Sequence, residues 1–199
     1  MKFKPVTIGL AVSALFICSA FAQTMPVQTQ VAPTAYVLDP AQSMVQFFVN
    51  ARLTNVKGIF KQFYVANITQ TGDDITSLRG NLLIDTASVF TREKKRDDHL
   101  KADDFFWSEK FPNATVTVKD IKAAGTPDLY NVTISLGIRD KQKDFIVPTT
   151  IVRNGPGLVA NGKFIVDRTF YDLNGEYLAN KIMDDEAEIT FRLTLNKNK

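Results

Sequence analysis

The segment Asp97-Asp98-His99 is the place in the sequence where general base chemistry is most easily imagined, because His99 is the only histidine of the chain. A histidine held by a carboxylate can serve as a general base, but a hydrolase also needs a nucleophile beside it. No Gly-x-Ser-x-Gly sequence is present to provide a serine nucleophile. We therefore expect the His99 ring to hold its own segment through a local hydrogen bond. Contact with a ligand head group is the second interpretation, and lipid hydrolysis with Asp97 or Asp98 is the alternative function.

Few side chains in this sequence could bind a metal ion. A zinc site needs several cysteine or histidine ligands, and His99 and Cys18 are the only residues of these types. The acidic pairs near residues 103–104 and 184–186 offer oxygens without the ligand spacing of a calcium loop. We predict that these carboxylates are solvated or cap helices, and we expect neither a metal nor another cofactor.

Three cations, Arg96, Lys101 and Arg168, have the chemistry to bind a phosphate or carboxylate head group. A guanidinium group binds such anions through two parallel hydrogen bonds. The competing interpretation is an ion pair with neighbouring acids. For Arg96 the ion pair is favoured, whereas for Arg168 both interpretations stay open.

Most of these groups lie in residues 91–112, which combine many charges with several phenylalanines and the only tryptophan, Trp107. Strand-like sequence flanks this segment on both sides. We predict a short helix within residues 92–100, with Ser88 or Thr91 as its N-cap. A charged segment tipped with aromatic residues, crossing between strands, is expected to form the lid or mouth of a β-scaffold.

The rest of the sequence alternates between apolar and polar residues with period two, which indicates strands. The clearest case runs through residues 186–195, where Ala187, Ile189, Phe191, Leu193 and Leu195 share one face. The expected strands are residues 43–51, 58–69, 75–85, 114–121, 129–138, 145–152, 157–167 and 186–195. Asn161-Gly162 signals a bulge or tight turn within the seventh of them. About eight or nine such strands predict an all-β sandwich or barrel.

The first 35 residues differ from the remainder. Lys2 and Lys4, the apolar run that follows, and Ala20-Phe21-Ala22 fit a cleaved signal peptide over residues 1–22. Residues 23–35 are interpreted as a flexible leader. The remaining chain lacks cysteine, so its core alone must stabilise it. We expect one domain over residues 36–199, exported to a bacterial periplasm.

The charge balance excludes a nucleic-acid footprint. Loss of Lys2 and Lys4 with the signal peptide lowers the net charge from +3 to +1, because 22 basic and 21 acidic residues remain. Such a chain has no excess of positive charge to neutralise phosphates. The apolar run of the signal peptide is also too short for a good membrane-spanning helix, so no transmembrane segment is expected.

Six pieces of the chain, in order, resemble the YceI family of bacterial exported proteins. The pieces are residues 36–43 with Phe47, 56–60, 84–89, 96–100, 104–112 and 166–168. The resemblance runs from about Tyr36 to Leu195. It implies a lipocalin-like antiparallel barrel of eight strands, with a short helical crossing segment near residues 91–112. Its interior would hold a long apolar chain, typically an isoprenoid, with the polar head at the mouth, and a homodimer is one implied oligomeric state.

We therefore predict a periplasmic protein that carries or sequesters an isoprenoid-type amphiphile, such as a polyprenyl phosphate, a quinone or a fatty-acid derivative, without turnover. A solid-core interaction module is a further alternative. The predicted ligand-binding residues are Phe47, Val49, Phe60, Val89, His99, Phe105, Phe106, Trp107, Phe111, Ile134, Phe145, Phe164 and Arg168. Trp107 stands where an acid is common in the family and is expected to narrow or reshape the entrance. Each buried methylene contributes about 0.8 kcal/mol, so a tail of about ten carbons is sufficient for useful affinity after the costs of association.

Overall fold

The computed structural model describes residues 33–175 and 183–198. Its strands are β1 (Pro33–Leu38), β2 (Met44–Ala51), β3 (Val56–Phe60), β4 (Phe63–Thr71), β5 (Arg79–Asp85), β6 (Val89–Phe90), β7 (Asn113–Ala123), β8 (Leu129–Ile138), β9 (Lys141–Asn154), β10 (Gly157–Asp167) and β11 (Met183–Lys197). Within these two ranges the strands are joined by one α-helix, α1 (Lys94–Leu100), and by four 3₁₀ turns, η1 (Pro40–Gln42), η2 (Ile75–Ser77), η3 (Thr86–Ser88) and η4 (Thr169–Tyr171).

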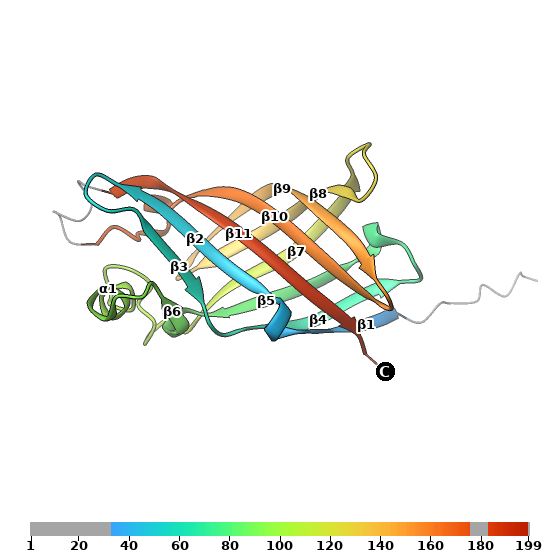
Figure 1. Ribbon diagram of the computed structural model, residues 1–199, viewed down its shortest axis with the longest axis horizontal. Helices are drawn as coiled ribbons and strands as arrows, with labels where there is room; N and C mark the ends of the chain where they lie inside the picture. The colour runs from blue at the N-terminus through green and yellow to red at the C-terminus, as the bar shows by residue number, and fades with distance from the viewer. Residues whose placement is uncertain (1–32, 176–182, 199) are drawn as a thin grey trace, which may run out of the picture. The chain divides into compact units, whose positions relative to one another are not determined.

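Eight of these strands form a closed antiparallel barrel (Figure 1). Their order is β1-β4-β5-β7-β8-β9-β10-β11, and pairing of β1 with β11 closes the ring. The long strands β7 to β10 are joined by short connections, as expected for neighbours in an up-and-down barrel, whereas a longer segment that includes η4 lies between β10 and β11. The predicted all-β, eight-stranded, lipocalin-like barrel is confirmed.

Three further strands extend the wall at the end of the barrel where α1 lies. After η1 interrupts the chain, β2 pairs with β11 between Met183 and Arg192, whereas β1 pairs with the last residues of β11. Strand β3 then pairs with β2, and the two-residue strand β6 pairs with β3. The expected single strand over residues 58–69 is therefore two strands, which are separated at Lys61 and Gln62.

The segment between β6 and β7 contains α1, as predicted, but neither predicted N-cap is correct. Glu93 caps the helix, since its carboxylate accepts hydrogen bonds from the Lys95 and Arg96 backbone amides at 2.9 and 3.1 Å. The Thr91 hydroxyl instead donates to Asp97 Oδ1 at 2.6 Å and accepts from the Arg96 side chain at 2.8 Å. We call residues 91–112 the cap segment.

The inward faces of the strands form two buried apolar clusters. The cap-end cluster includes Phe47, Phe60, Leu82 and Ala187, and the base cluster at the opposite end includes Leu158. In β11 the alternating residues predicted to share a face do so, and that face points inward. Several long side chains, among them Phe164 and Leu193, pack against both clusters.

The predicted irregularity at Asn161-Gly162 is wrong. Strand β10 pairs in unbroken register with β9 and β11 through both residues. A Cβ atom placed on Gly162 would lie 2.5 Å from the Phe191 ring. Glycine is thus needed here because the Phe191 side chain packs directly over the backbone, and the strand does not bend.

Tyr36 and Gln70 form a buried polar pair at the base of the barrel. The Tyr36 hydroxyl donates to Gln70 Oε1 at 2.6 Å, and the two residues are 7% and 1% exposed. Burial raises the pKa of the Tyr36 hydroxyl above its ordinary value, while nearby Arg153 acts in the opposite direction. Within the described residues the Gln70 amide nitrogen has no hydrogen-bond partner.

Replacing Gln70 by leucine is expected to lower the free energy of unfolding by about 1–3 kcal/mol, because the buried Tyr36 hydroxyl loses its acceptor. The double variant Tyr36→Phe/Gln70→Leu removes both polar partners and is expected to recover most of that loss. Urea unfolding of the two variants measures the difference. A double variant as unstable as Gln70→Leu alone would contradict this account of the pair.

Candidate functional site: a cavity inside the barrel

A cavity of about 210 Å³ runs inside the barrel. Its walls come from both the cap-end cluster and the base cluster, and nearly all of the wall atoms are apolar. An apolar hollow of this kind is favourable for hydrocarbon and unfavourable for water, which finds too few polar partners there. The barrel is therefore hollow along its interior.

Eight of the predicted ligand-binding residues line this cavity. They are Phe47, Val49, Phe60, Phe105, Phe106, Ile134, Phe164 and Arg168. They come from β2, β3, β8, β10, the cap segment and the residue that follows β10. Alternation positions the lining residues that lie on strands, because every second side chain of an antiparallel barrel strand points inward.

Five predicted residues are not among those that line the cavity. Val89 is buried in the cap-end cluster, and Phe145 packs against Phe164 with ring centroids 5.3 Å apart. His99, Trp107 and Phe111 belong to the cap segment but contact other parts of it. A role in ligand binding stays a prediction for these five, as it does for the eight residues that line the cavity.

Sequence reasoning missed many smaller aliphatic wall residues. Among them are Leu82, Ile84, Val116, Leu136, Ile138, Leu158 and Ile189. Their signal was present in the period-two alternation, which marks inward-facing positions regardless of residue size.

The cap segment closes one end of the cavity with apolar side chains. Leu100, Phe105 and Phe106 line the cavity from this segment. A chain of ring contacts connects the cap to the wall, because Phe60 lies 5.8 Å from Phe47 and 5.5 Å from Phe106, measured between centroids. Such tilted and edge-on pairs stabilise packing beyond the area they bury. The segment that was predicted to form a lid or mouth thus covers one end of the cavity.

Polar contacts fasten the cap segment to the barrel rim. Arg139, in the turn between β8 and β9, donates to the carbonyl oxygens of Phe105 and Asp172 at 3.1 and 3.0 Å. The Asp104 carbonyl oxygen accepts from the backbone amides of Asn174 and Gly175 at 3.2 and 3.1 Å. The cap is therefore held to two rim segments through its backbone.

His99 pairs with Asp104, and neither Asp97 nor Asp98 is its partner. The distance from His99 Nε2 to Asp104 Oδ2 is 2.8 Å, whereas Asp97 accepts from Thr91 and Asp98 pairs with Lys94. The His99 ring also lies edge-on to Phe105, with centroids 5.0 Å apart. Within the described residues no hydroxyl group is bonded to His99. The hydrogen bond that the sequence predicted for this ring is therefore present inside the cap segment.

Arg168 is the charged residue among those that line the cavity. It is only 3% exposed, and its guanidinium group donates to the carbonyl oxygens of Asp184 and Leu173 at 2.8 and 2.7 Å. It also contacts Met183 O and Asp185 Oδ1, each at 3.3 Å. Burial lowers the pKa of Arg168, and the neighbouring carboxylates oppose that shift. Arg168 thus joins η4 to the start of β11 and brings a positive charge to the cap end of the cavity.

Trp107 is not among the residues that line the cavity. Its ring packs edge-on against Phe111, with centroids 5.8 Å apart, and the Lys110 ammonium lies 4.1 Å from its centroid. The Arg139 guanidinium carbon lies 5.5 Å from the same ring. These cation–π contacts indicate that Trp107 stabilises the cap itself.

The described residues contain no group of three histidine, cysteine, aspartate or glutamate side chains close enough to hold a metal ion. Over the same part of the chain, no helix combines the length and apolar character that a membrane crossing requires.

Residues 36–195 match the family model described as the YceI-like domain. The chain belongs to the YceI-like family. Among curated relatives it is similar to a UPF0312 protein of Staphylococcus epidermidis, with 35% identity over 91 residues, which cover 44% of this chain and 52% of the relative. A UPF0312 protein of Staphylococcus aureus is 34% identical over 89 residues, with the same coverage. The matched part of this YceI-like chain thus spans about half the length of these relatives.

Solved structures show the same fold as this YceI-like barrel. BcnA of Burkholderia cenocepacia aligns with a TM-score of 0.72 and 28% identity, covering 79% of this chain and 98% of BcnA. A polyisoprenoid binding domain from Saccharophagus degradans aligns with a TM-score of 0.68 and 19% identity, covering 83% and 99%. The YceI protein of Campylobacter jejuni aligns with a TM-score of 0.62 and 22% identity, covering 74% and 88%.

Proposed function

We propose that this protein binds an amphiphile with a long apolar tail, of the isoprenoid type, and carries or sequesters it without chemical turnover. The observation that carries the proposal is the closed barrel around one apolar cavity, capped at one end by Phe105 and Phe106. The similar fold of a polyisoprenoid binding domain supports the same ligand class. Removal of residues 1–22 and a periplasmic location belong to the proposal, although these residues lie outside the described part of the chain.

The direction in which the ligand enters follows from the charge distribution. Arg168 brings its positive charge to the cap end, and the remainder of the wall is apolar apart from groups such as Thr149, whose hydroxyl is bonded to Val147 O at 3.0 Å. The head group therefore lies toward the cap end, with the tail along the barrel. His99, in the cap segment, is close to this end and remains a head-group candidate. A homodimer, as the resemblance implies, is a separate proposal that sedimentation would test.

Removing the bound amphiphile is expected to lower the melting temperature. A ligand present at 100 times its Kd stabilises the folded state by about 2.7 kcal/mol. For a domain of this size that corresponds to a shift of roughly 5–10 °C. Native mass spectrometry of gently purified protein would identify the bound mass, and differential scanning calorimetry before and after organic extraction would measure the shift.

The matched control is a head group without a tail, inorganic phosphate, which should leave the melting temperature unchanged because it buries no methylenes. Re-addition of a prenyl phosphate or a quinone should restore it. Tail binding would be contradicted if the purified protein carried no apolar compound and took up neither a prenyl phosphate nor a quinone. Its melting temperature would then be the same before extraction, after extraction and after re-addition. This outcome would favour the alternative of an interaction module that binds no ligand.

A further inference from the structure

The deep end of the cavity is closed by a defined set of side chains in the base cluster. Leu78, Leu158 and Leu195 of this cluster line the cavity, whereas its members Tyr36, Leu38 and Ile75 do not. The non-lining members come from β1 and η2, which lie at the end of the barrel opposite α1 (Figure 1). The empty space therefore ends against a floor, which we define as Tyr36, Leu38, Ile75 and the buried Gln70.

The strand register places Leu38 beside the lining residues and Tyr36 beyond them, because Tyr36 pairs with Lys197, two residues after Leu195. Leu38 of β1 pairs with Leu195 of β11, and Leu195 pairs with Leu158 of β10. Leu158 is completely buried and Leu195 is 4% exposed, so both side chains are shielded from solvent. Above them, the lining residues of β10 extend as far as Val166. Eight residue steps along a tilted strand give a depth of about 20 Å.

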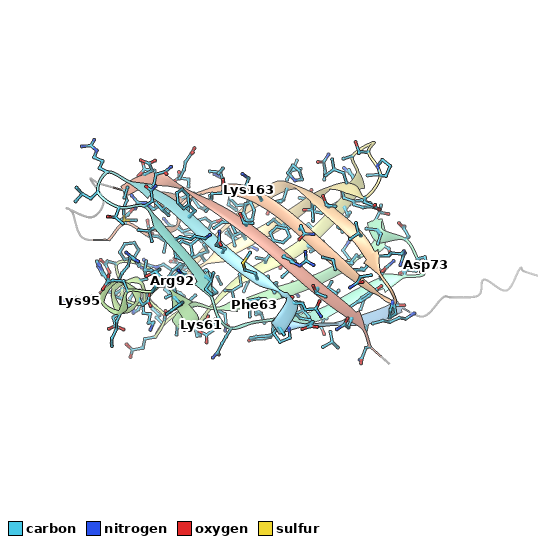
Figure 2. The ribbon with its side chains drawn as sticks, in the orientation of Figure 1. Lys61, Phe63, Asp73, Arg92, Lys95 and Lys163 are labelled. Atoms are coloured by element: carbon cyan, nitrogen blue, oxygen red, sulfur yellow. The ribbon has the colours of Figure 1, made fainter. Side chains whose placement is uncertain are left out.

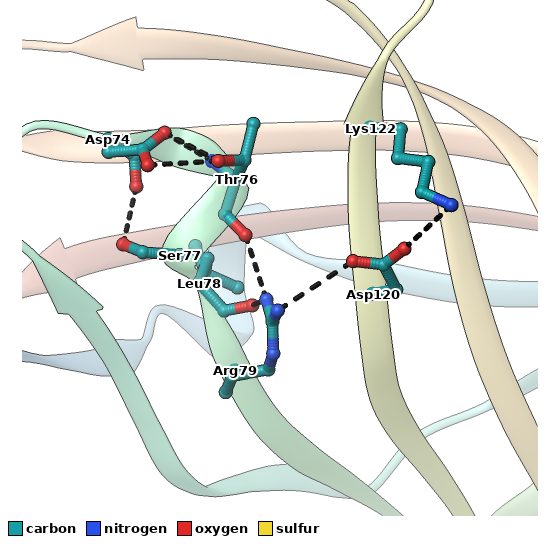
Figure 3. Close-up of polar contacts among 7 residues, drawn as sticks. All are labelled: Asp74, Thr76, Ser77, Leu78, Arg79, Asp120 and Lys122. Carbon is teal, nitrogen blue, oxygen red and sulfur yellow. Dashed lines mark hydrogen bonds and ion pairs between the residues drawn. The ribbon is translucent and has the colours of Figure 1, made fainter.

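The turn that carries Ile75 is held by hydrogen bonds on its outer side (Figure 3). The Asp74 carboxylate accepts from the Thr76 amide and hydroxyl at 2.9 and 2.8 Å, and the Ser77 hydroxyl donates to Asp74 O at 2.6 Å. The two hydrogen bonds from Thr76 lower the pKa of the Asp74 carboxyl group. The floor residue on η2 therefore has a fixed position.

Arg79 fixes the other side of the same turn. It donates to the carbonyl oxygens of Thr76 and Leu78 at 2.8 Å each and pairs with Asp120 of β7 at 3.7 Å (Figure 3). Arg153 of β9 pairs with Asp73 at 3.5 Å, and Figure 2 shows Asp73 at the end far from Arg92 and Lys95 of the cap segment. Contacts from β5, β7 and β9 thus brace the floor.

We infer that this floor limits the length of the bound tail, so that Gln70 and its neighbours determine ligand specificity. The inference rests on the proposed function, because it concerns a tail that enters from the cap end. A methylene added to a tail that still fits contributes about 0.8 kcal/mol, which is about a fourfold gain in affinity. A methylene added beyond the floor must force apart packed side chains or bend the tail, and it gains nothing.

The test uses straight-chain alkyl phosphates of increasing length with the mature protein, with Kd measured by isothermal titration calorimetry. Affinity is expected to rise about fourfold per methylene and then to stop rising at one chain length. Gln70→Ala removes floor volume and should move this limit to tails about one or two carbons longer. Leu78→Phe fills the deep end and should move the limit to shorter tails, and this variant keeps the test decisive if Gln70→Ala does not fold.

The control is Gln142→Ala, which makes the same change at an exposed position of β9 and should leave the limit where it is. Affinity that keeps rising with length through the whole series, or a limit that neither Gln70→Ala nor Leu78→Phe moves, would overturn the floor while leaving tail binding intact. Absence of binding at every chain length would instead refute the proposed function itself.

Discussion

Replacing Ala187 by phenylalanine is expected to reduce the affinity for long-tailed amphiphiles by at least about a hundredfold. Ala187 is 8% exposed, lines the cavity and is paired with Val49 of β2 and Val166 of β10, near the cap end. A benzyl group at this position projects into the path that the tail must follow. Excluding about four methylenes costs about 3 kcal/mol, which is about a hundredfold in Kd.

Ala123→Phe is the matched control, because it makes the same change at an exposed position at the end of β7. Its affinity for a prenyl phosphate should equal that of the unmodified protein. Ala187→Phe should still melt cooperatively, since the added ring enters space that is already empty. A folded Ala187→Phe protein with unchanged affinity would show that the tail does not lie inside the barrel.

Arg168→Met is expected to lower the free energy of unfolding by about 3–5 kcal/mol. The guanidinium group satisfies the carbonyl oxygens of Leu173, Met183 and Asp184, and methionine offers no donor to any of them. Each buried polar group left without a partner costs about 1–3 kcal/mol. The loss is measured by urea unfolding monitored through Trp107 fluorescence and circular dichroism.

Arg192→Met provides the comparison, because Arg192 is an exposed arginine on β11. Its substitution should change the free energy of unfolding by less than about 0.5 kcal/mol. Arg168→Lys should recover only part of the stability, because an ammonium group lacks the planar fork that reaches several carbonyls. An Arg168→Met protein as stable as Arg192→Met would mean that these hydrogen bonds contribute little. Arg168 would then be better regarded as a head-group ligand than as a structural residue.

Much of the barrel was predictable from alternation, yet the break between β3 and β4 was not. Turns without glycine or proline leave little signal, and Lys61-Gln62 is such a turn. The contacts that create it come from residues far along the chain. Ser88 O accepts from the Lys61 amide at 3.1 Å, and the Asp85 amide donates to Gln62 O at 3.0 Å. Only the folded barrel brings these groups together.

In the candidate site, too, some residues could be predicted from the local sequence pattern, whereas the positions of others depend on contacts between distant parts of the chain. Phe47 and Phe164 were predicted to bind the ligand, and both line the cavity from strands whose alternation places them inward. Phe145 also packs inward but its ring rests on Phe164, and alternation cannot tell a wall residue from one packed behind it. In the cap segment, where no period-two pattern applies, Phe105 and Phe106 line the cavity while Trp107 does not.

Closure of the sheet between β1 and β11 also bears on how the protein behaves when it is concentrated. An unpaired strand margin is a template on which a second chain can add its own strand, and this is the first step toward fibrils. In the described part of the chain the last strand in the sheet order is β6, which is two residues long and includes Val89, a side chain only 3% exposed, so this end offers little room for an added strand. A fold without disulfide bonds thus resists edge-to-edge aggregation through its topology.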